Sequence, residues 1–391
     1  MGLLGNIKDF IRTNIITYLL FVYIFIVSSI IVNFVMLLTA IFIWPFNKEL
    51  YRKVNYHLAY LVWSQFTCVS QWFSNCECVL YMDPEDKKHV LKEHLTIIMN
   101  HTYEIDWLLA WIICERYGIL GGTKIYGKQA LALIPIIGWC WYFTESMFLK
   151  RDWRKDKEII EAGLQKTIAY PDDYWVTLLL FPEGTRFTEE KHKASLEVAK
   201  MKGYPQYKYH LLPRTRGFVM SVQAMRGKKN VNAIYDCTMA FPGGEPEPSL
   251  MNVLRGREKK VIGHFRVKRH ALEELPETDD DLSEFLRNMF KEKDEVLDNF
   301  YKTGKMDLPA HTIPWRYNDL INWIFWALVT CIPLFSYLGS ILISGTFFQK
   351  ATVIILFTLA SLLSRWMVGF SETHKGSSYG KEVKINNNKA D

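Results

Sequence analysis

The sequence of 391 residues predicts an α/β domain, with a mixed sheet flanked by helices, between membrane-spanning helices at both ends. Three observations lead to this prediction. Residues 15–44 contain no charged side chain, and two further apolar stretches, residues 320–343 and 351–370, lie near the C-terminus. These lengths suit helices that cross a bilayer. Between them, short apolar segments alternate with longer segments of helical periodicity, which is typical of an α/β domain.

The first apolar stretch, residues 15–44, is too long for the core of a signal peptide, so we expect it to be retained. It also exceeds one perpendicular span. Either one tilted helix or two half-helices broken near Ser28-Ser29 or Asn33 would fit. Residues 56–73 follow as a candidate helix that either packs on the domain or lies in the membrane interface.

The central region alternates strand-like and helix-like segments. The predicted strands are residues 78–82, 94–99, 143–149, 175–181, 231–241 and 260–266. The predicted helices are residues 106–117, 156–169, 189–201, 215–225 and 279–301. This order favours a mostly parallel or mixed sheet.

One apolar segment, residues 128–141, is too short to cross a bilayer and contains Pro135 and Gly138. Three placements are open for it. It dips into the bilayer surface, lines a tunnel for an acyl chain, or packs in the core of the domain.

The two C-terminal stretches are joined by a short turn and predict a helical hairpin, followed by a polar, basic tail that we expect to be disordered. Basic residues after the first span and in this tail favour a cytosolic domain. We therefore divide the chain into an N-terminal membrane segment (1–50), the α/β domain (51–310), the hairpin (311–370) and the tail (371–391).

The formal net charge is +6, and the basic residues are spread along the chain and beside its apolar segments. This distribution suits anionic lipid headgroups better than a nucleic-acid groove, and we find no nucleic-acid motif. The seven cysteines form no paired Cys-x-x-Cys set, so we expect buried free thiols and no metal site.

The main candidate for chemistry is the pair His101 and Asp106, which directly follows the apolar run 94–99. A carboxylate beside an imidazole fixes the tautomer and orientation of the ring. The spacing alone also fits a structural turn. Asn100-His101-Thr102 matches a glycosylation sequon, which a cytosolic domain would leave unmodified.

A second motif, Phe181-Pro182-Glu183-Gly184-Thr185-Arg186, follows another apolar strand. It would place a carboxylate, a flexible glycine and a guanidinium at a strand end, where α/β sheets usually bind ligands. An ordinary Pro-Gly turn with surface charges is the alternative.

Taken together, these segments resemble the glycerolipid acyltransferase family, in which His-x4-Asp and Glu-Gly-Thr-Arg are the first and third motifs. Residues 148–151 resemble the second motif, although Glu145 stands where a glycine is usual, and Leu212-Pro213 resembles the fourth. The segment KYHLLPRTRGF, the paired C-terminal spans and the KGSSYG tail are similar to the gamma and delta type of 1-acylglycerol-3-phosphate acyltransferase.

The resemblance implies an acyl transfer in which His101 accepts the proton of a lipid hydroxyl and Asp106 orients the ring. No serine or cysteine sits in a nucleophile motif, so direct transfer is expected rather than an acyl-enzyme. Backbone N–H groups around Gly184 and Thr185 are candidate donors to the oxyanion.

The resemblance also implies contacts with the phosphate of the acceptor by Lys128, Arg151 and Arg186, for each of which a salt bridge or a solvated charge is the alternative. Glu183 is expected to bind the acceptor or to fix its loop.

The implied reaction transfers an acyl group from acyl-CoA, as co-substrate and without a further cofactor, to the sn-2 hydroxyl of lysophosphatidic acid. Two alternatives are another lysophospholipid acceptor and a non-catalytic, membrane-shaping protein that binds lipid. We expect a multi-pass protein of the endoplasmic reticulum membrane, with Golgi and mitochondrial membranes, the acyl-chain preference and the oligomeric state left open.

Overall fold

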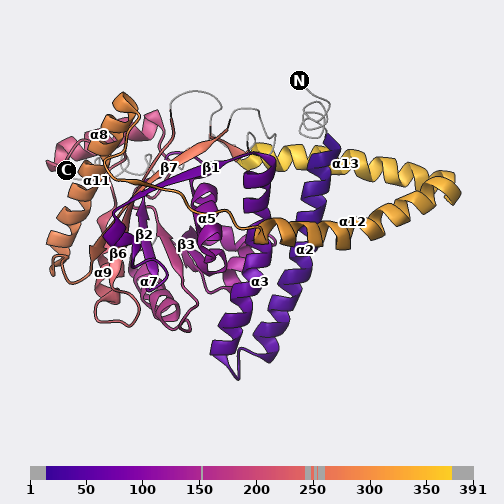
Figure 1. Ribbon diagram of the computed structural model, residues 1–391, viewed down its shortest axis with the longest axis horizontal. Coiled ribbons are helices and arrows are strands. Elements are labelled where there is room, and N and C mark those ends of the chain that lie inside the picture. The colour runs from indigo at the N-terminus through magenta and orange to yellow at the C-terminus, as the bar shows by residue number, and fades with distance from the viewer. Residues whose placement is uncertain (1–14, 151–152, 243–247, 251–252, 254–259, 372–391) are drawn as a thin grey trace, which may run out of the picture.

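A computed structural model describes residues 15–150, 153–242, 248–250, 253 and 260–371. Figure 1 shows a helix-covered sheet domain beside four long helices, α2, α3, α12 and α13. Three parts of the chain named in the sequence analysis lie outside the described residues. They are residues 1–14, Arg151 and the tail from residue 372.

Eight strands of the described chain form one sheet, in the order β4-β3-β5-β2-β6-β7-β1-β8. The strands β4, β3, β5, β2 and β6 run parallel to one another, whereas β7 is antiparallel to β6 and parallel to β1. The mixed sheet of the prediction is therefore confirmed. The strands are β1 (Glu77–Met82), β2 (Leu95–Met99), β3 (Thr123–Lys128), β4 (Met147–Leu149), β5 (Thr177–Leu180), β6 (Ala233–Ala240), β7 (Ile262–Ala271) and β8 (Ala310–His311).

Helices cover both faces of this sheet. The face that carries α3 and α5 has its own apolar cluster, and α7, α9 and α11 pack with a second cluster on the other face. The helices and helical turns are α2 (Ile15–Phe42), α3 (Lys48–Cys68), the π-helix η1 (Val69–Phe73), α4 (Pro84–Lys87), α5 (Asp106–Tyr117), η2 (Leu120–Gly122), η3 (Gln129–Leu133), α6 (Ile137–Phe143), α7 (Trp153–Ile168), α8 (Glu189–Lys202), α9 (Thr215–Met225), α11 (Asp279–Thr303), α12 (Asn318–Ser344) and α13 (Phe347–Ser371).

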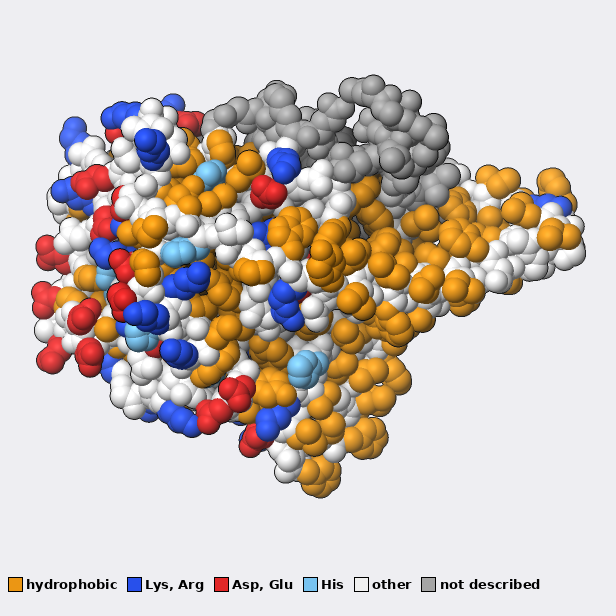
Figure 2. Space-filling view, viewed as in Figure 1, with side chains coloured by type: hydrophobic (Ala, Val, Ile, Leu, Met, Phe, Trp, Pro, Cys, Tyr) orange, Lys and Arg blue, Asp and Glu red, His pale blue; other side chains and the backbone are white. Residues whose placement is uncertain are grey.

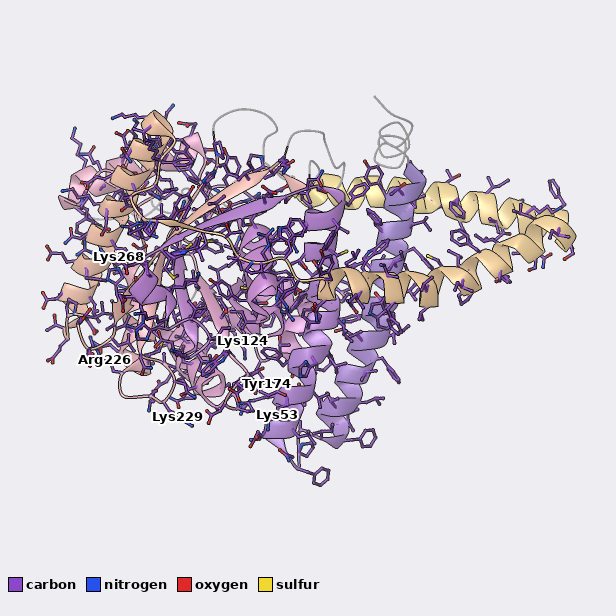
Figure 3. All side chains as sticks on the ribbon, in the orientation of Figure 1. Lys53, Lys124, Tyr174, Arg226, Lys229 and Lys268 are labelled. Atoms are coloured by element: carbon purple, nitrogen blue, oxygen red, sulfur yellow. The ribbon has the colours of Figure 1, made fainter. Side chains whose placement is uncertain are left out.

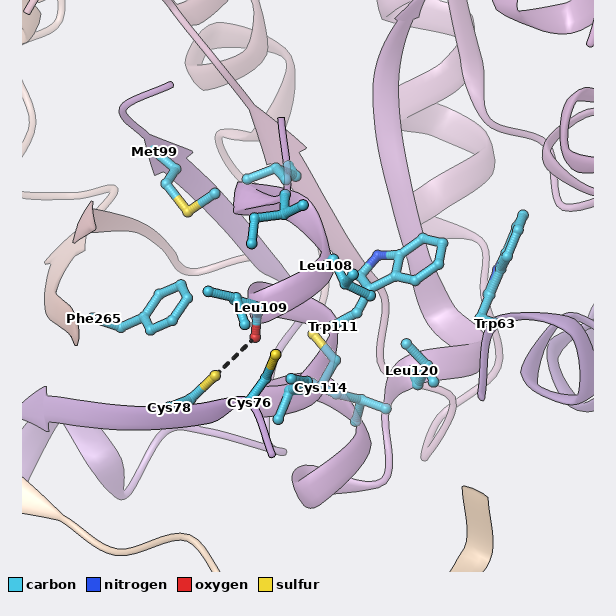
Figure 4. Close-up of a cluster of buried hydrophobic side chains, with 14 of the residues drawn as sticks. Trp63, Cys76, Cys78, Met99, Leu108, Leu109, Trp111, Cys114, Leu120 and Phe265 are labelled. Carbon is cyan, nitrogen blue, oxygen red and sulfur yellow. Dashed lines mark hydrogen bonds between the residues drawn. The ribbon is translucent and has the colours of Figure 1, made fainter. Parts of the chain in front are cut away.

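The central strands are buried along almost their whole length because both of their faces are covered. Every residue of β5 and β6 is buried, whereas β1 alternates buried and half-buried residues. Figure 4 shows part of the cluster on the α3 and α5 side, in which the rings of Trp63 and Trp111 lie 4.8 Å apart. In the same cluster the Cys78 thiol donates to the carbonyl of Leu109 (3.3 Å).

The N-terminal apolar stretch forms one continuous helix, α2, rather than two half-helices. Helix α3 begins earlier than the candidate helix 56–73 because Asn47 caps it, with its side chain accepting from the Leu50 N–H (2.9 Å). Its last turn widens into the π-helix η1. Ala59 and Trp63 are fully buried against the domain, so α3 packs on the domain.

Polar side chains join α2, α3 and α12 inside this helical group. Each pair hydrogen-bonds between two helices, as polar residues do where helices meet in lipid. The pairs are Gln65 with Ser28 (2.9 Å), Asn55 with Thr39 (2.8 Å) and Asn322 with Ser64 (2.8 Å).

Two helices, over Thr17–Phe42 and Asn318–Ser344, are long and apolar enough to cross a membrane, and α13 is apolar over Phe347–Leu359. Figure 2 shows hydrophobic side chains covering the projecting hairpin of α12 and α13 and the lower end of α2 and α3. Charged side chains gather instead on the sheet domain.

Two details differ from the sequence prediction, and the structure describes one segment whose placement was left open. The strand β3 (Thr123–Lys128) was not predicted. The predicted strand 143–149 is wrong over its first half, because Phe143 ends α6 and Glu145 turns the chain with a φ of +60° before β4 begins. The segment 128–141 forms η3 and α6 and leaves Leu133 81% exposed while Cys140 is buried.

The cysteines agree with the prediction of free thiols. All seven are unpaired, six of them are buried, and Cys331 of α12 is half-buried.

Candidate active site

The predicted functional segments meet at one edge of the sheet. The strands β4, β3, β5 and β2 are neighbours and run parallel, so their carboxyl ends lie side by side. Strand β2 leads to His101, β5 leads to Glu183, and β3 ends at Lys128. Such an edge is where α/β sheets bind ligands.

His101 and Asp106 form a hydrogen-bonded pair. The Nδ1 atom of His101 lies 3.0 Å from Oδ2 of Asp106. The same oxygen accepts the N–H groups of Thr102 (2.7 Å) and Tyr103 (3.0 Å), so the carboxylate also shapes the turn. Asp106 is buried at the first position of α5, whereas the His101 side chain is 18% exposed. This contact assigns the proton to Nδ1 and leaves Nε2 as an acceptor.

The segment after β5 holds the histidine from its other side. The ring of His101 stacks on Phe181 with centroids 4.1 Å apart, and its carbonyl accepts from the Phe187 N–H (2.9 Å). Its backbone N–H donates to Oε1 of Glu183 (2.8 Å), while Oε2 accepts from Leu211 (3.0 Å). One buried carboxylate thus ties three loops of the site together.

Burial raises the pKa of Glu183 to about 8, against the opposing effect of the two backbone N–H donors. The side chain is 3% exposed. Because each oxygen accepts an N–H group, the geometry favours the ionised form more than burial alone would suggest.

Gly184 adopts a φ of +69°, which glycine tolerates without strain. A Cβ at this position would lie 3.2 Å from Nε of Arg214. The Gly184 N–H donates to the carbonyl of Phe181 (3.0 Å) inside the turn, so it is already engaged. The other predicted oxyanion donor is the backbone N–H of Thr185, which has no hydrogen-bond partner among the described residues. The hydroxyl of Thr185 accepts a hydrogen bond from Lys191 (2.8 Å).

Arg186 lies beside the histidine turn and is 36% exposed. Its Nη1 atom is 3.5 Å from Oε2 of Glu104, and the other oxygen of Glu104 accepts from the Leu250 N–H (2.6 Å). A single long contact of this kind holds a guanidinium weakly. Arg186 can therefore exchange this partner for an anionic ligand.

Of the two remaining predicted basic residues, the structure places Lys128, on the strand next to β5. Lys128 is exposed at the end of β3 and pairs in register with Leu149 of β4. The backbone N–H of Lys150 donates to Asp156 (2.7 Å) of α7, which fixes the exit of β4. Arg151 follows immediately and lies outside the described residues.

Two supporting residues were missed from the sequence. The buried amide of Asn100 bonds both the carbonyl (3.0 Å) and the N–H (2.8 Å) of Met239, tying β2 to β6. This burial closes the sequon to a glycan in the folded domain. Lys293 of α11 donates to the carbonyls of Ile98 (3.2 Å) and Cys237 (2.6 Å) beneath the site. Its position in an amphipathic helix far along the chain gave no signal.

No group of three or more His, Cys, Asp or Glu side chains in the described residues could hold a metal ion. An imidazole that is held by a carboxylate, as His101 is by Asp106, can act as a general base.

The chain is similar to known acyltransferases. The family described as "Acyltransferase" matches residues 82–241, and "Acyltransferase C-terminus" matches residues 252–326. The human protein named 1-acyl-sn-glycerol-3-phosphate acyltransferase delta is 41% identical over 375 residues, covering 96% of this chain and 97% of that protein. The mouse protein named 1-acyl-sn-glycerol-3-phosphate acyltransferase gamma is 41% identical over 387 residues, covering 98% of each.

Among solved structures, the crystal structure of the 1-acyl-sn-glycerophosphate acyltransferase PlsC from Thermotoga maritima matches with 15% sequence identity and a TM-score of 0.40. It covers 72% of this chain and 95% of that one.

Proposed function

We propose a specific reaction for this chain on the premise that it belongs to the 1-acyl-sn-glycerol-3-phosphate acyltransferase family. The reaction is the transfer of an acyl group from acyl-CoA to the sn-2 hydroxyl of lysophosphatidic acid, which gives phosphatidic acid. The observation that carries this proposal is the His101–Asp106 pair at the sheet edge that also presents Lys128 and Arg186.

The acceptor hydroxyl is a weak nucleophile at neutral pH. In the proposed step, Nε2 of His101 takes its proton while the oxygen attacks the thioester carbonyl, which contributes ~10²- to 10⁴-fold to the rate. Asp106 stabilises the imidazolium. A C–O bond forms and a C–S bond breaks, and the proton held by His101 passes to the departing CoA sulfur. The Thr185 N–H is the candidate donor to the oxyanion.

The acceptor phosphate fits the side of the site where the cations lie. Arg186 follows β5, and Lys128 ends β3, one strand further from β2. At about 4.8 Å per strand, Lys128 lies roughly 10 Å from the histidine strand measured across the sheet. A glycerol phosphate lying along this edge would therefore bring its free hydroxyl toward His101.

Apolar side chains near this region support a membrane-bound enzyme. Phe42 (67% exposed) and Phe46 (87%) mark the end of α2 and the turn after it, and Leu133 (81%) and Tyr142 (69%) stand on η3 and α6. With the two long apolar helices, they support membrane association. We propose the endoplasmic reticulum membrane as its location, with the domain in the cytosol, an orientation that the basic residues after the first span favour.

The test is an acceptor panel with the purified full chain and labelled acyl-CoA. We expect turnover of lysophosphatidic acid to exceed that of neutral and zwitterionic lysolipids, and His101→Ala to remove it. Equal turnover of a lysolipid with a phosphodiester headgroup would favour a remodelling enzyme instead. Retention of activity by His101→Ala, in a folded variant, would overturn the assignment of the base.

A further inference from the structure

We propose that Arg52 of α3 and Glu145 are positioning residues. Their ion pair fixes the position of strands β3 and β4, at the edge of the sheet that receives the acceptor headgroup. This inference rests on the proposed function, because it concerns the acceptor side of that reaction. It assigns to the helix next to the first membrane span a part in binding the substrate.

The pair is buried and makes more than one contact. Nε of Arg52 lies 2.8 Å from Oε2 of Glu145, and Nη2 lies 3.3 Å from Oε1. Both side chains are 10% exposed. The remaining Nη1 group donates to the carbonyl of Ala169 (3.0 Å), just beyond α7. A fork of this kind fixes direction as well as distance.

The backbone of Glu145 supports a specific role for its side chain. Its φ of +60° lies in the left-handed region, which is unfavourable for a residue with a Cβ. Such positions persist where the surrounding structure holds them. Here the turn between α6 and β4 carries a carboxylate, and that carboxylate reaches back to α3.

Helix α3 also contacts the beginning of β3. A Cβ added to Gly121 would lie 2.2 Å from the carbonyl oxygen of Tyr56, so the two backbones touch directly. One turn earlier, the Tyr51 hydroxyl donates to the carbonyl of Phe143 (2.7 Å) at the end of α6. Both strands that lead to the predicted acceptor residues therefore start against the same helix.

Strand β4 depends on such anchors because it has three residues, Met147–Leu149, and lies at the edge of the sheet. It pairs with β3 up to Lys128 and Leu149. Glu145 holds its start, and the bond from the Lys150 N–H to Asp156 holds its end. A shift at the start would move the residues at its end.

A second buried basic residue, Lys124, makes the carboxylate of Glu145 harder to replace. Lys124 of β3 is fully buried and lies over the ring of Tyr170, with Nζ 4.1 Å from the centroid. Its amine finds no hydrogen-bond partner in the described structure, and Figure 3 places it between the sheet and α3. The Tyr170 hydroxyl in turn donates to the carbonyl of Thr144 (3.3 Å). Neutralising Glu145 would leave the guanidinium of Arg52 and the amine of Lys124 without this carboxylate.

The test is steady-state kinetics of Glu145→Gln in the full chain, with each substrate varied in turn. We expect the KM for lysophosphatidic acid to rise about tenfold while the KM for acyl-CoA stays within about twofold. A merely structural loss would lower the fraction of active enzyme, and thus the apparent kcat, without moving either KM. KM reports on the folded molecules alone, so partial unfolding does not obscure the result.

The matched control is Glu93→Gln. Glu93 pairs with Arg269 at 2.7 Å, and the side chains are 2% and 13% exposed, but this pair lies at the opposite end of β2 from His101. We expect Glu93→Gln to lower thermal stability and leave both KM values unchanged. Arg52→Lys keeps the charge but loses the fork, so its acceptor KM should fall between wild type and Arg52→Gln.

The outcomes separate the two proposals. A wild-type chain that does not acylate lysophosphatidic acid overturns the proposed function and this inference with it. An active wild type whose Glu145→Gln variant keeps its acceptor KM within about twofold overturns the positioning role alone. An equal rise of the acceptor KM in Glu93→Gln would also overturn it, since the effect would then be general.

Discussion

Replacing Glu145 by glycine sets two opposing effects against each other. Glycine would remove the strain of a φ of +60°, which is of the order of 1 kcal/mol for a residue in this region. The same change leaves the buried guanidinium of Arg52 without its carboxylate. Losing one partner of a buried pair costs about 3 to 5 kcal/mol.

The lower end of that range applies here, because Arg52 keeps its bond to the carbonyl of Ala169. We therefore expect Glu145→Gly to lower the free energy of unfolding by about 2 kcal/mol despite the relaxed backbone. At about 2.1 cal/mol/K of unfolding entropy per residue, this corresponds for 391 residues to a fall in the melting temperature of roughly 2 to 3 °C. Thermal denaturation of the full chain in detergent measures it.

The double variant Arg52→Met with Glu145→Gly identifies the source of the loss. It removes the unpaired charge while keeping the relaxed turn, so its stability should recover to near that of wild type or above. If Glu145→Gly alone were as stable as wild type, or if the double variant were no better, the ion pair would contribute nothing of this kind.

Three further predictions concern the site and the core. Asp106→Asn should lower kcat by ~10²- to 10⁴-fold in the acyl-transfer assay, because an amide no longer fixes the Nδ1–H tautomer of His101; unchanged kcat would remove Asp106 from the mechanism. Glu183→Gln should lower the free energy of unfolding, measured by denaturant titration, by about 1 to 3 kcal/mol, because the NH2 group of the glutamine would face one of the two backbone N–H donors. A stability equal to that of wild type would contradict the two-donor geometry. Burial lowers the pKa of Lys124 to about 7, below its unfolded value of 10.5, so the folded chain loses this proton first and its stability rises as the pH increases from about 7 to 10. Lys124→Met should therefore stabilise the protein by ~2 kcal/mol at and below pH 7, with the gain vanishing near pH 10, and a gain independent of pH would refute this.

The sequence predicted those parts of the molecule whose secondary structure is determined by residues that are neighbours in the chain. Segments rich in apolar residues indicated β2, β5 and β6, and the polar residues that follow β2 and β5 indicated the sheet edge of the candidate site. Helix α5 begins at Asp106 and ends before Gly118, whose φ of +77° stops it, so both bounds were predicted correctly.

The contacts that were missed join residues far apart in the chain. Strand β3 contains Lys124, and a lysine in a sequence usually indicates an exposed position. In the structure, its amine is buried against the ring of Tyr170, which lies far along the chain. Glu145 was noted as a departure from glycine, but nothing near it in the sequence indicated its partner Arg52. Lys293 likewise reaches β2 and β6 from a helix late in the chain. The domain boundaries drawn from composition stay a prediction.

The distribution of the thiols has a practical consequence for measuring conformational changes of this protein with a label. Burial raises the pKa of Cys76, Cys114 and Cys237 to about 12. Reagents that react with thiolates should therefore not modify these cysteines in the folded chain. Cys331, half-buried on α12, is the most accessible of the seven. A membrane-permeant fluorophore or spin label should thus attach at one place without any engineered cysteine, and it would report on the C-terminal hairpin in the wild-type enzyme.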